Sequence, residues 1–372
     1  MTAAFANQST IGVLLLGATG SLGSRILWAL LERPFINVTA VVRNRNKLKE
    51  ATSHHQQPCR QISGTAPPSP RERLSIIEGS ATDSGLFARL IQEREIRVLV
   101  NAAGHAPMFA RNGSGTVADG ENKAQSIDNE VACIVRASID AVHEVGGSGT
   151  GGTSDLKMRG WFIGGMLLLD LPGTKPVAGS DQKAQTLDEY LPLYLHHRPL
   201  EAMLRSSEYL DWTLVCPAKM VPRSGVSNVP TSSASPGYED TPTPTGKDMH
   251  SRVLPALFAS SNVPPKWEIW PFFRRIPWGI GPLLEIIANS ARYTVSFEDV
   301  AEFIVDGIVQ DHLSQEQQKQ GLLEVYQNDH NSDQVETQEP TVGQGRGSEI
   351  SGERGAVWIN TKIGLIAASG NN

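Results

Sequence analysis

The chain has 372 residues, of which 40% are hydrophobic, and it carries a formal net charge of -6. That length suits one large domain or two smaller ones, with ample material for a hydrophobic core. The mild acidity argues against nucleic acid or an anionic membrane as the main partner.

The cysteines and the N-terminus bear on compartment. The chain has three cysteines, Cys59, Cys133 and Cys216, which are far apart and lack the spacing of metal ligands. We therefore expect a reducing, cytoplasmic location and no metal site. The N-terminus has no basic region or cleavage signal, and no apolar run reaches the length of a membrane span, so we expect neither a signal peptide nor a membrane span.

Residues 11–31 carry the clearest pattern in the chain. An apolar run leads into three glycines, and residues 24–31 follow at helical period. This order predicts a buried strand, a turn that can hold a phosphate, and a helix. The alternative is a glycine-rich turn without a ligand. The predicted contacts with a dinucleotide are Gly17, Thr19, Gly20, Ser21, Leu22 and Gly23.

The second predicted strand, residues 36–42, ends at Arg43. In dinucleotide folds an acid at this place binds the ribose of NAD, whereas an arginine accommodates the 2′-phosphate of NADP. Arg43 therefore favours NADP, and NAD is the second choice. The alternative is a solvated basic loop.

Residues 51–73 are rich in proline, and we expect them to form an exposed insertion. Candidate contacts with the cofactor follow at the ends of the next two strands. Asp83 comes after the third strand and either contacts the adenine or caps the next helix. The fourth strand ends in small residues that leave room for a flat cofactor, namely Ala102, Ala103 and Gly104. Alternation of strands and helices continues to residue 217 and predicts an α/β fold with one doubly wound parallel sheet.

We expect residues 9–225 to form the nucleotide-binding domain. Residues 226–310 would complete the same fold as a smaller C-terminal region covering the substrate. Their aromatic part, residues 263–293, predicts a substrate cover or a small satellite core; contact with a membrane surface is a further alternative, for which two arginines give little support. Residues 311–355 are predicted to be flexible, and residues 356–372 to form a tail with a short strand at 356–359.

Four motifs resemble one family in the right order. The Gly17–Gly23 turn and the Asn101–Gly104 strand end are similar to those of short-chain dehydrogenases. Residues 210–217 and 293–301 resemble the late strand and helix start of the NmrA-like, atypical short-chain group. The proline-rich and glycine-rich insertions also resemble those of fungal secondary-metabolite oxidoreductases, and residues 76–83 are similar to a stretch of averufin-oxidase-like proteins. The resemblance implies a Rossmann-like, NAD(P)-dependent oxidoreductase with a small-molecule substrate.

The family's catalytic residues are not matched. A serine after the fifth strand and a Tyr-x-x-x-Lys on the next helix are usual in the family, but Gly164–Met166 stands at the serine region. Two registers of the next helix offer Tyr194 in a Tyr-x-x-x-Arg and His197 at the lysine position. Tyr194 and His197 are therefore the predicted acid–base residues.

Three functions remain open on this pattern. The first is an NADP-dependent oxidoreductase acting on a small or medium organic metabolite, with secondary-metabolite biosynthesis as the candidate pathway. The second is an NAD(P)-sensing regulator without chemistry, and the third is an isomerase or dehydratase without net redox change.

Overall fold

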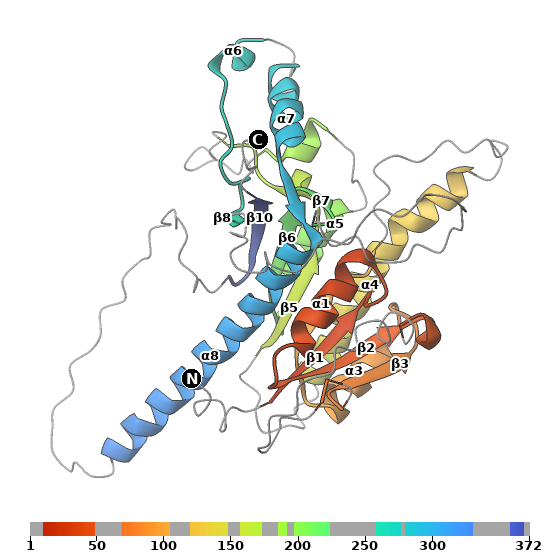
Figure 1. Ribbon diagram of the computed structural model, residues 1–372, viewed down its shortest axis with the longest axis vertical. Helices are drawn as coiled ribbons and strands as arrows, with labels where there is room; N and C mark the ends of the chain where they lie inside the picture. The colour runs from red at the N-terminus through yellow and green to blue at the C-terminus, as the bar shows by residue number, and fades with distance from the viewer. Residues whose placement is uncertain are drawn as a thin grey trace, which may run out of the picture.

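The computed structural model describes residues 10–48, 69–70, 72–104, 120–147, 157–172, 185–191, 197–223, 257–276, 280–329 and 358–367. Figure 1 shows a twisted sheet with helices on both faces. The sheet has eight strands in the order β3-β2-β1-β4-β5-β6-β10-β8. All neighbours are parallel except β10 and β8. The predicted doubly wound parallel sheet is confirmed.

The strands of the large sheet are β1 Ile11–Leu16, β2 Ile36–Val42, β3 Leu74–Glu78, β4 Ile96–Asn101, β5 Met158–Ile163, β6 Leu210–Pro217, β8 Leu257–Ser261 and β10 Thr361–Ala367. A second, two-stranded sheet pairs β7 Lys219–Val221 with β9 Thr294–Ser296. Every residue of β1 is buried. This continuous burial is what a parallel strand with both faces covered requires, and it explains the unbroken apolar run in the sequence.

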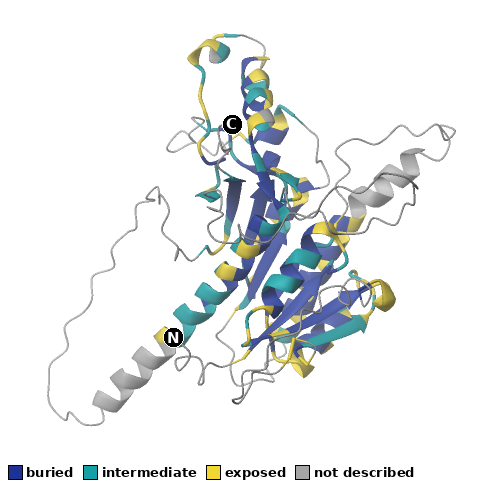
Figure 2. Ribbon diagram, viewed as in Figure 1, coloured by how far each residue is buried: buried dark blue, intermediate teal, exposed yellow. Residues whose placement is uncertain are grey.

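The helices divide into two layers with separate cores. One face of the sheet is covered by α1 Ser21–Leu31 and α8 Phe297–Asp329, and the other by α3 Ser84–Glu93, α4 Gly120–Gly147 and α5 Arg198–Arg205. The 3-10 turns η1 Met166–Leu168 and η2 Leu187–Glu189 follow β5, and α6 Pro271–Arg274 and α7 Ile280–Arg292 precede β9. The buried residues in Figure 2 follow the sheet and the inner sides of these helices.

The C-terminal part of the sequence differs from expectation in two places. The strand expected at residues 356–359 lies at Thr361–Ala367, where it is an inner strand between β6 and β8. Residues 311–329, expected to be flexible, continue α8. Their Gln- and Glu-rich composition is compatible with a helix, because both residue types have good helix propensity. Most of the insertion predicted at residues 51–73 lies outside the described residues. Its last residue, Arg73, was expected to be exposed but is 7% exposed and donates to the carbonyls of Leu31, Arg33 and Ile36.

A buried ion pair holds α8 against the sheet. The Nε of Arg159 on β5 lies 2.5 Å from Oδ2 of Asp311, and the two side chains are 5% and 8% exposed. The same guanidinium donates to Thr213 Oγ1 at 2.6 Å and to the carbonyl of Trp358. Arg159 therefore joins β5, β6, α8 and the approach to β10.

Replacing Arg159 with alanine leaves the buried carboxylate of Asp311 without its cation. We expect a loss of about 3–5 kcal/mol in the free energy of unfolding. The control is Arg33→Ala. Arg33 follows α1 and its Nη2 lies 2.8 Å from Oδ1 of Asp306 on α8, and the two side chains are 40% and 58% exposed. That change should cost less than about 1 kcal/mol. Urea unfolding compares the two variants, and equal losses would contradict the role of burial.

Candidate functional site

The turn after β1 brings two strand ends into direct contact. Gly17 has φ of 80°, and a Cβ added there would lie 2.5 Å from the backbone N of Ala103 and 2.6 Å from the carbonyl carbon of Ala102. Only glycine fits both the dihedral angle and the space. The carboxyl ends of β1 and β4 therefore meet where the strand order reverses, which is the ligand-binding position of open α/β sheets.

Gly23 and Gly20 shape the start of α1. A Cβ on Gly23 would lie 2.0 Å from the carbonyl oxygen of Gly17, so the helix packs directly on the turn. A Cβ on Gly20 would meet only that oxygen, at 3.3 Å. Gly20 is the extended N-cap residue of α1 and makes no side-chain cap, and the first helical turn has no acidic residue. The first N–H groups of such a helix have no partner within the helix and favour an anion.

The other predicted residues of the turn have different surroundings. Thr19 is half-buried and Ser21 is exposed. Leu22 is only 7% exposed and packs in the core beneath α1, so its contribution to a ligand would come from its backbone.

The start of α8 holds this turn in place, which sequence reasoning missed. Arg25 donates from Nε to Glu298 Oε1 at 2.6 Å and from Nη1 to the carbonyl of Ser21 at 2.6 Å. Burial alone would raise the pKa of Glu298, but the hydrogen bonds from Arg25 and from the backbone N–H groups of Glu298 and Arg223, together with the charge of Arg25, hold this pKa below its usual range. Ser296 caps α8 as its sequence suggests, with Oγ accepting from the N–H of Asp299 at 2.9 Å.

The small residues at the end of β4 line the opposite side of the turn. Asn101 is buried and its Oδ1 accepts from the N–H of Ala103 at 3.0 Å. Ala102 donates to the carbonyl of Leu16 at 3.1 Å. Ala102 and Ala103 are half-buried, and Gly104 is exposed with φ of 152°. The strand end is thus fixed by its own hydrogen bonds.

Arg43 and Asp83 lie at the ends of the two strands beyond β1. Arg43 directly follows β2, is 85% exposed, and its Nη1 lies 3.7 Å from Glu130 of α4. Asp83 accepts from the N–H of Leu86 at 2.9 Å and is the N-cap of α3. The capping role foreseen for Asp83 is therefore present, and its predicted contact with adenine stays a prediction.

The residues around the turn fit a dinucleotide. The turn combines glycines that no side chain could replace with a helix N-terminus free of acidic residues. The backbone from Gly17 to Gly23 would hold the pyrophosphate, Arg43 would face the adenosine end, and residues 102–104 would border the nicotinamide. Among the described residues no group of side chains has the composition of a metal site.

The structure describes one of the two predicted acid–base residues. Tyr194 lies outside the described residues. His197 is 6% exposed and stands at the N-cap of α5. After β5, a Cβ on Gly164 would lie 3.2 Å from the Sγ of Cys216, and Met166 is buried. The described residues directly after β5, from Gly164 to Met166, carry no hydroxyl.

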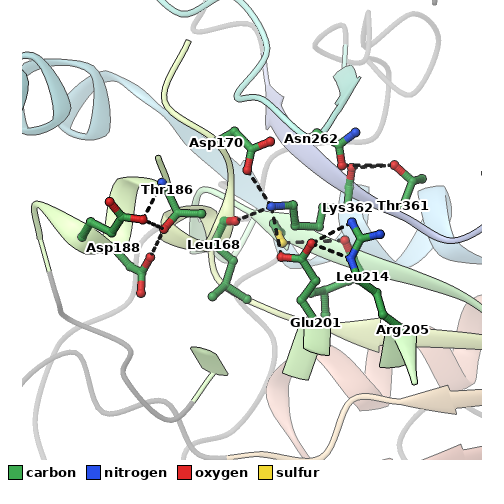
Figure 3. Close-up of polar contacts among 12 residues, drawn as sticks. Leu168, Asp170, Thr186, Asp188, Glu201, Arg205, Leu214, Asn262, Thr361 and Lys362 are labelled. Carbon is green, nitrogen blue, oxygen red and sulfur yellow. Dashed lines mark hydrogen bonds and ion pairs between the residues drawn. The ribbon is translucent and has the colours of Figure 1, made fainter. Parts of the chain in front are cut away.

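A buried cluster of charges lies between β10, η1 and α5 (Figure 3). The ammonium group of Lys362 lies 2.7 Å from Asp170 Oδ1, 3.2 Å from Glu201 Oε2 and 3.0 Å from the carbonyl of Leu168. Its side chain is 3% exposed. Because these three contacts occupy the three donors of an ammonium group, Lys362 is a structural cation rather than a free proton donor.

The charges of the cluster stabilise one another. Burial alone would lower the pKa of Lys362, but Asp170 and Glu201 raise it above its usual value. Burial alone would raise the pKa of Glu201, but Lys362 and Arg205 hold it below its usual value. Burial raises the pKa of the nearby Cys216 to about 12, so this thiol is inert at neutral pH. The sequence offers one indication of the strand, the apolar run that follows Lys362.

Residues 13–153 match the family model described as the NAD dependent epimerase/dehydratase family. This match covers the glycine turn, Arg43 and the end of β4. No match to a curated protein was found.

Solved structures with similar folds include proteins of several activities. A provisionally assigned epimerase from Bacteroides thetaiotaomicron is 13% identical, with 96% of this chain and 98% of that one covered and a TM-score of 0.43. A provisionally assigned NADH-flavin reductase from Streptococcus pneumoniae is 14% identical, with 96% and 99% covered and a TM-score of 0.41. The UDP-glucuronic acid 4-epimerase of Bacillus cereus, solved with NAD, is 14% identical, with 57% and 59% covered and a TM-score of 0.39. Similarities this distant do not identify a substrate.

Replacing Gly23 with alanine tests the packing of α1 on the turn. The new Cβ would lie 2.0 Å from the Gly17 carbonyl oxygen, so we expect a loss of about 3 kcal/mol in the free energy of unfolding. The control is Gly85→Ala in α3, where the new Cβ would lie 3.7 Å from Asp83 Oδ1, an ordinary contact distance, and alanine improves helix propensity. Thermal and urea unfolding measure both. A Gly23→Ala protein as stable as the wild type would contradict this geometry.

Replacing Lys362 with methionine tests the buried cluster. We expect a loss of about 3 kcal/mol near neutral pH, because the half-buried Asp170 loses its cation and the buried Glu201 is left with Arg205 alone. The contribution of Glu201 is complete above pH 4.5 and is lost as the pH falls through its lowered pKa. That of Lys362 is complete below pH 10.5 and is lost as the pH rises through its raised pKa.

Urea unfolding at a series of pH values should therefore show a constant difference between wild type and Lys362→Met near neutrality, and a smaller one at both extremes. The control is Lys219→Met, at an exposed position on β7. A difference that does not depend on pH would contradict the ionic origin of the stabilisation.

Proposed function

We propose that the protein is an NADP-dependent oxidoreductase of the atypical short-chain type, acting in the cytoplasm on a small or medium organic metabolite. The observation that carries this proposal is the glycine turn, in which Gly17 and Gly23 leave no room for a side chain while the start of α1 stays open to an anion. The family match over residues 13–153 supports a nicotinamide dinucleotide as the ligand.

The preference for NADP rests on Arg43. Its guanidinium is 85% exposed at the end of β2, and its contact with Glu130 at 3.7 Å is too loose and too exposed to be worth much. It is therefore available to a 2′-phosphate, which an arginine can bind through two parallel hydrogen bonds.

When bound, the cofactor would supply a hydride acceptor or donor. The chain's own residues would hold it by backbone N–H groups at the start of α1 and keep its flat ring against Ala102 and Ala103. Tyr194 and His197 remain the proposed groups for moving the substrate proton, since a phenol or an imidazole can donate and accept one. The resemblance to fungal secondary-metabolite proteins supports an aromatic, polyketide-like substrate.

A non-redox isomerase or dehydratase is the second candidate. One observation favours it: the family model that matches residues 13–153 includes epimerases and dehydratases. A regulator that binds NAD(P) without chemistry rests on the absence of a hydroxyl at residues 164–166. Stoichiometric consumption of NADPH with a carbonyl or quinone substrate would exclude both.

The decisive experiment is calorimetric titration of the protein with NADPH and NADH. We expect tighter binding of NADPH, and we expect Arg43→Glu to weaken NADPH binding about tenfold or more through lost pairing and added repulsion, with little effect on NADH. The control is Arg97→Glu, the same change of charge at an exposed position. Arg97 lies near the amino end of β4, whereas Arg43 follows the carboxyl end of β2.

Equal affinities for NADPH in the two variants would show that Arg43 does not contact the 2′-phosphate. Absence of binding of either nucleotide to the wild-type protein would overturn the proposed function itself.

A further inference from the structure

Exposed apolar side chains gather on one part of the molecule. We call residues 266–276 and 280–292, which include α6 and α7, the α6–α7 projection. Figure 1 shows it extending away from the sheet, and Figure 2 shows exposed positions along it. Of the large hydrophobic side chains found exposed in the described part of the chain, all except Ile359 belong to the projection, namely Ile269, Phe272, Ile280, Leu284 and Ile287.

The inner face of α7 carries two buried polar residues beside an apolar one. Glu285 is 1% exposed and Asn289 is fully buried, while Ile286, also fully buried, packs in the main core. Glu285 accepts from the indole N–H of Trp267 at 2.8 Å, and Asn289 bonds to the backbone N–H and carbonyl of Glu268 at 3.2 and 3.0 Å. The hydroxyl of Tyr293 donates to the carbonyl of Lys266 at 2.5 Å. Hydrogen bonds to residues 266–268 thus hold α7 from its polar side.

The outer face of α7 is apolar. Ile280, Leu284 and Ile287 are 48%, 37% and 48% exposed, and their spacing of four and three residues places them on one stripe of the helix. Phe272 of α6 is 72% exposed and its ring lies tilted against that of Phe273, which in turn meets Trp270 edge to face. A helix on the surface of a globular protein normally turns its apolar stripe toward the core and its polar residues toward the solvent.

The projection is basic on an acidic protein. Residues 266–292 contain four basic residues, Lys266, Arg274, Arg275 and Arg292, and two acidic ones, whereas the whole chain has a net charge of -6. Both carboxylates are engaged within the projection, because Glu268 pairs with Arg292 and Glu285 accepts from Trp267. Lys266 and Arg275 are exposed.

We propose that the α6–α7 projection binds the surface of an anionic membrane. Exposed aromatic and branched apolar side chains beside basic residues are the composition of interfacial membrane anchors, which insert shallowly and are held by anionic headgroups. The excess positive charge argues against a second copy as the partner, since two projections would repel each other. No helix in the described residues is long and apolar enough to cross a membrane, so the contact would be with the surface.

The test is flotation of the full-length protein with phosphatidylcholine vesicles, with and without phosphatidylserine. We expect binding that requires phosphatidylserine and weakens as salt is added. The double variant Phe272→Ser, Ile287→Ser should bind about tenfold less, because it removes exposed apolar surface from the contact. Arg275→Glu should weaken binding to the anionic vesicles selectively.

Matched controls separate this contact from general effects. Ile359→Ser removes an exposed isoleucine outside the projection, and Arg97→Glu makes the same charge change away from it; both should bind as the wild type does. All these positions are exposed, so unchanged melting temperatures verify folding. Binding can be measured without any nucleotide, so its result does not depend on the proposed enzymatic function.

Three outcomes would overturn the proposal. The first is no flotation with anionic vesicles, and the second is flotation that the projection variants leave unchanged. The third is a wild-type dimer in sedimentation that the double variant makes monomeric while neither protein binds vesicles, which would assign the apolar stripe to a second copy.

Discussion

The close approach of Gly17 to the backbone of Ala102 and Ala103 is the constraint on which the N-terminal half of the sheet depends. Since no Cβ fits there, the ends of β1 and β4 can lie against each other and the chain can turn sharply into α1. Gly23 then lets α1 begin directly on that turn. The start of the helix therefore points at the place where the strand order reverses, and Arg25 with Glu298 fixes it there from the side of α8.

Buried ion pairs hold the C-terminal elements in place at the other end of the sheet. β10 is the last strand in the sequence, yet it lies between β6 and β8, and Lys362 joins it to Asp170 and Glu201. Arg159 joins β5 to Asp311 of α8. An apolar pair could supply equal stability at such sites, but removing one charge from an existing pair is strongly destabilising. These pairs therefore make correct placement of the C-terminal elements a condition of stability.

The elements that local sequence patterns determine could be predicted from the sequence. Apolar runs, glycine spacing and helical period were enough for the strands up to residue 217 and for the turn at Gly17. Lys362 could not be predicted as a buried cation, because a lysine ordinarily indicates an exposed position and its partners lie 192 and about 160 residues away in the sequence. Asp83 fitted two roles equally, and only the bond from Leu86 identifies its capping role. The acid–base residues depend on the register of a segment, residues 192–196, that pattern alone does not fix.

The aromatic segment at residues 263–293 illustrates why composition leaves such choices open. Tyr293 is buried and Trp267 packs partly against the main core, as expected of a satellite core, while Phe272 and the outer stripe of α7 face away from it. Composition cannot separate these sets, because both are apolar. The directions of the side chains separate them: Glu285 and Asn289 point inward and form hydrogen bonds there beside the buried Ile286, so the stripe of Ile280, Leu284 and Ile287 lies outward. A stripe left outward by a helix already satisfied on its inner face is best explained by a contact outside the molecule.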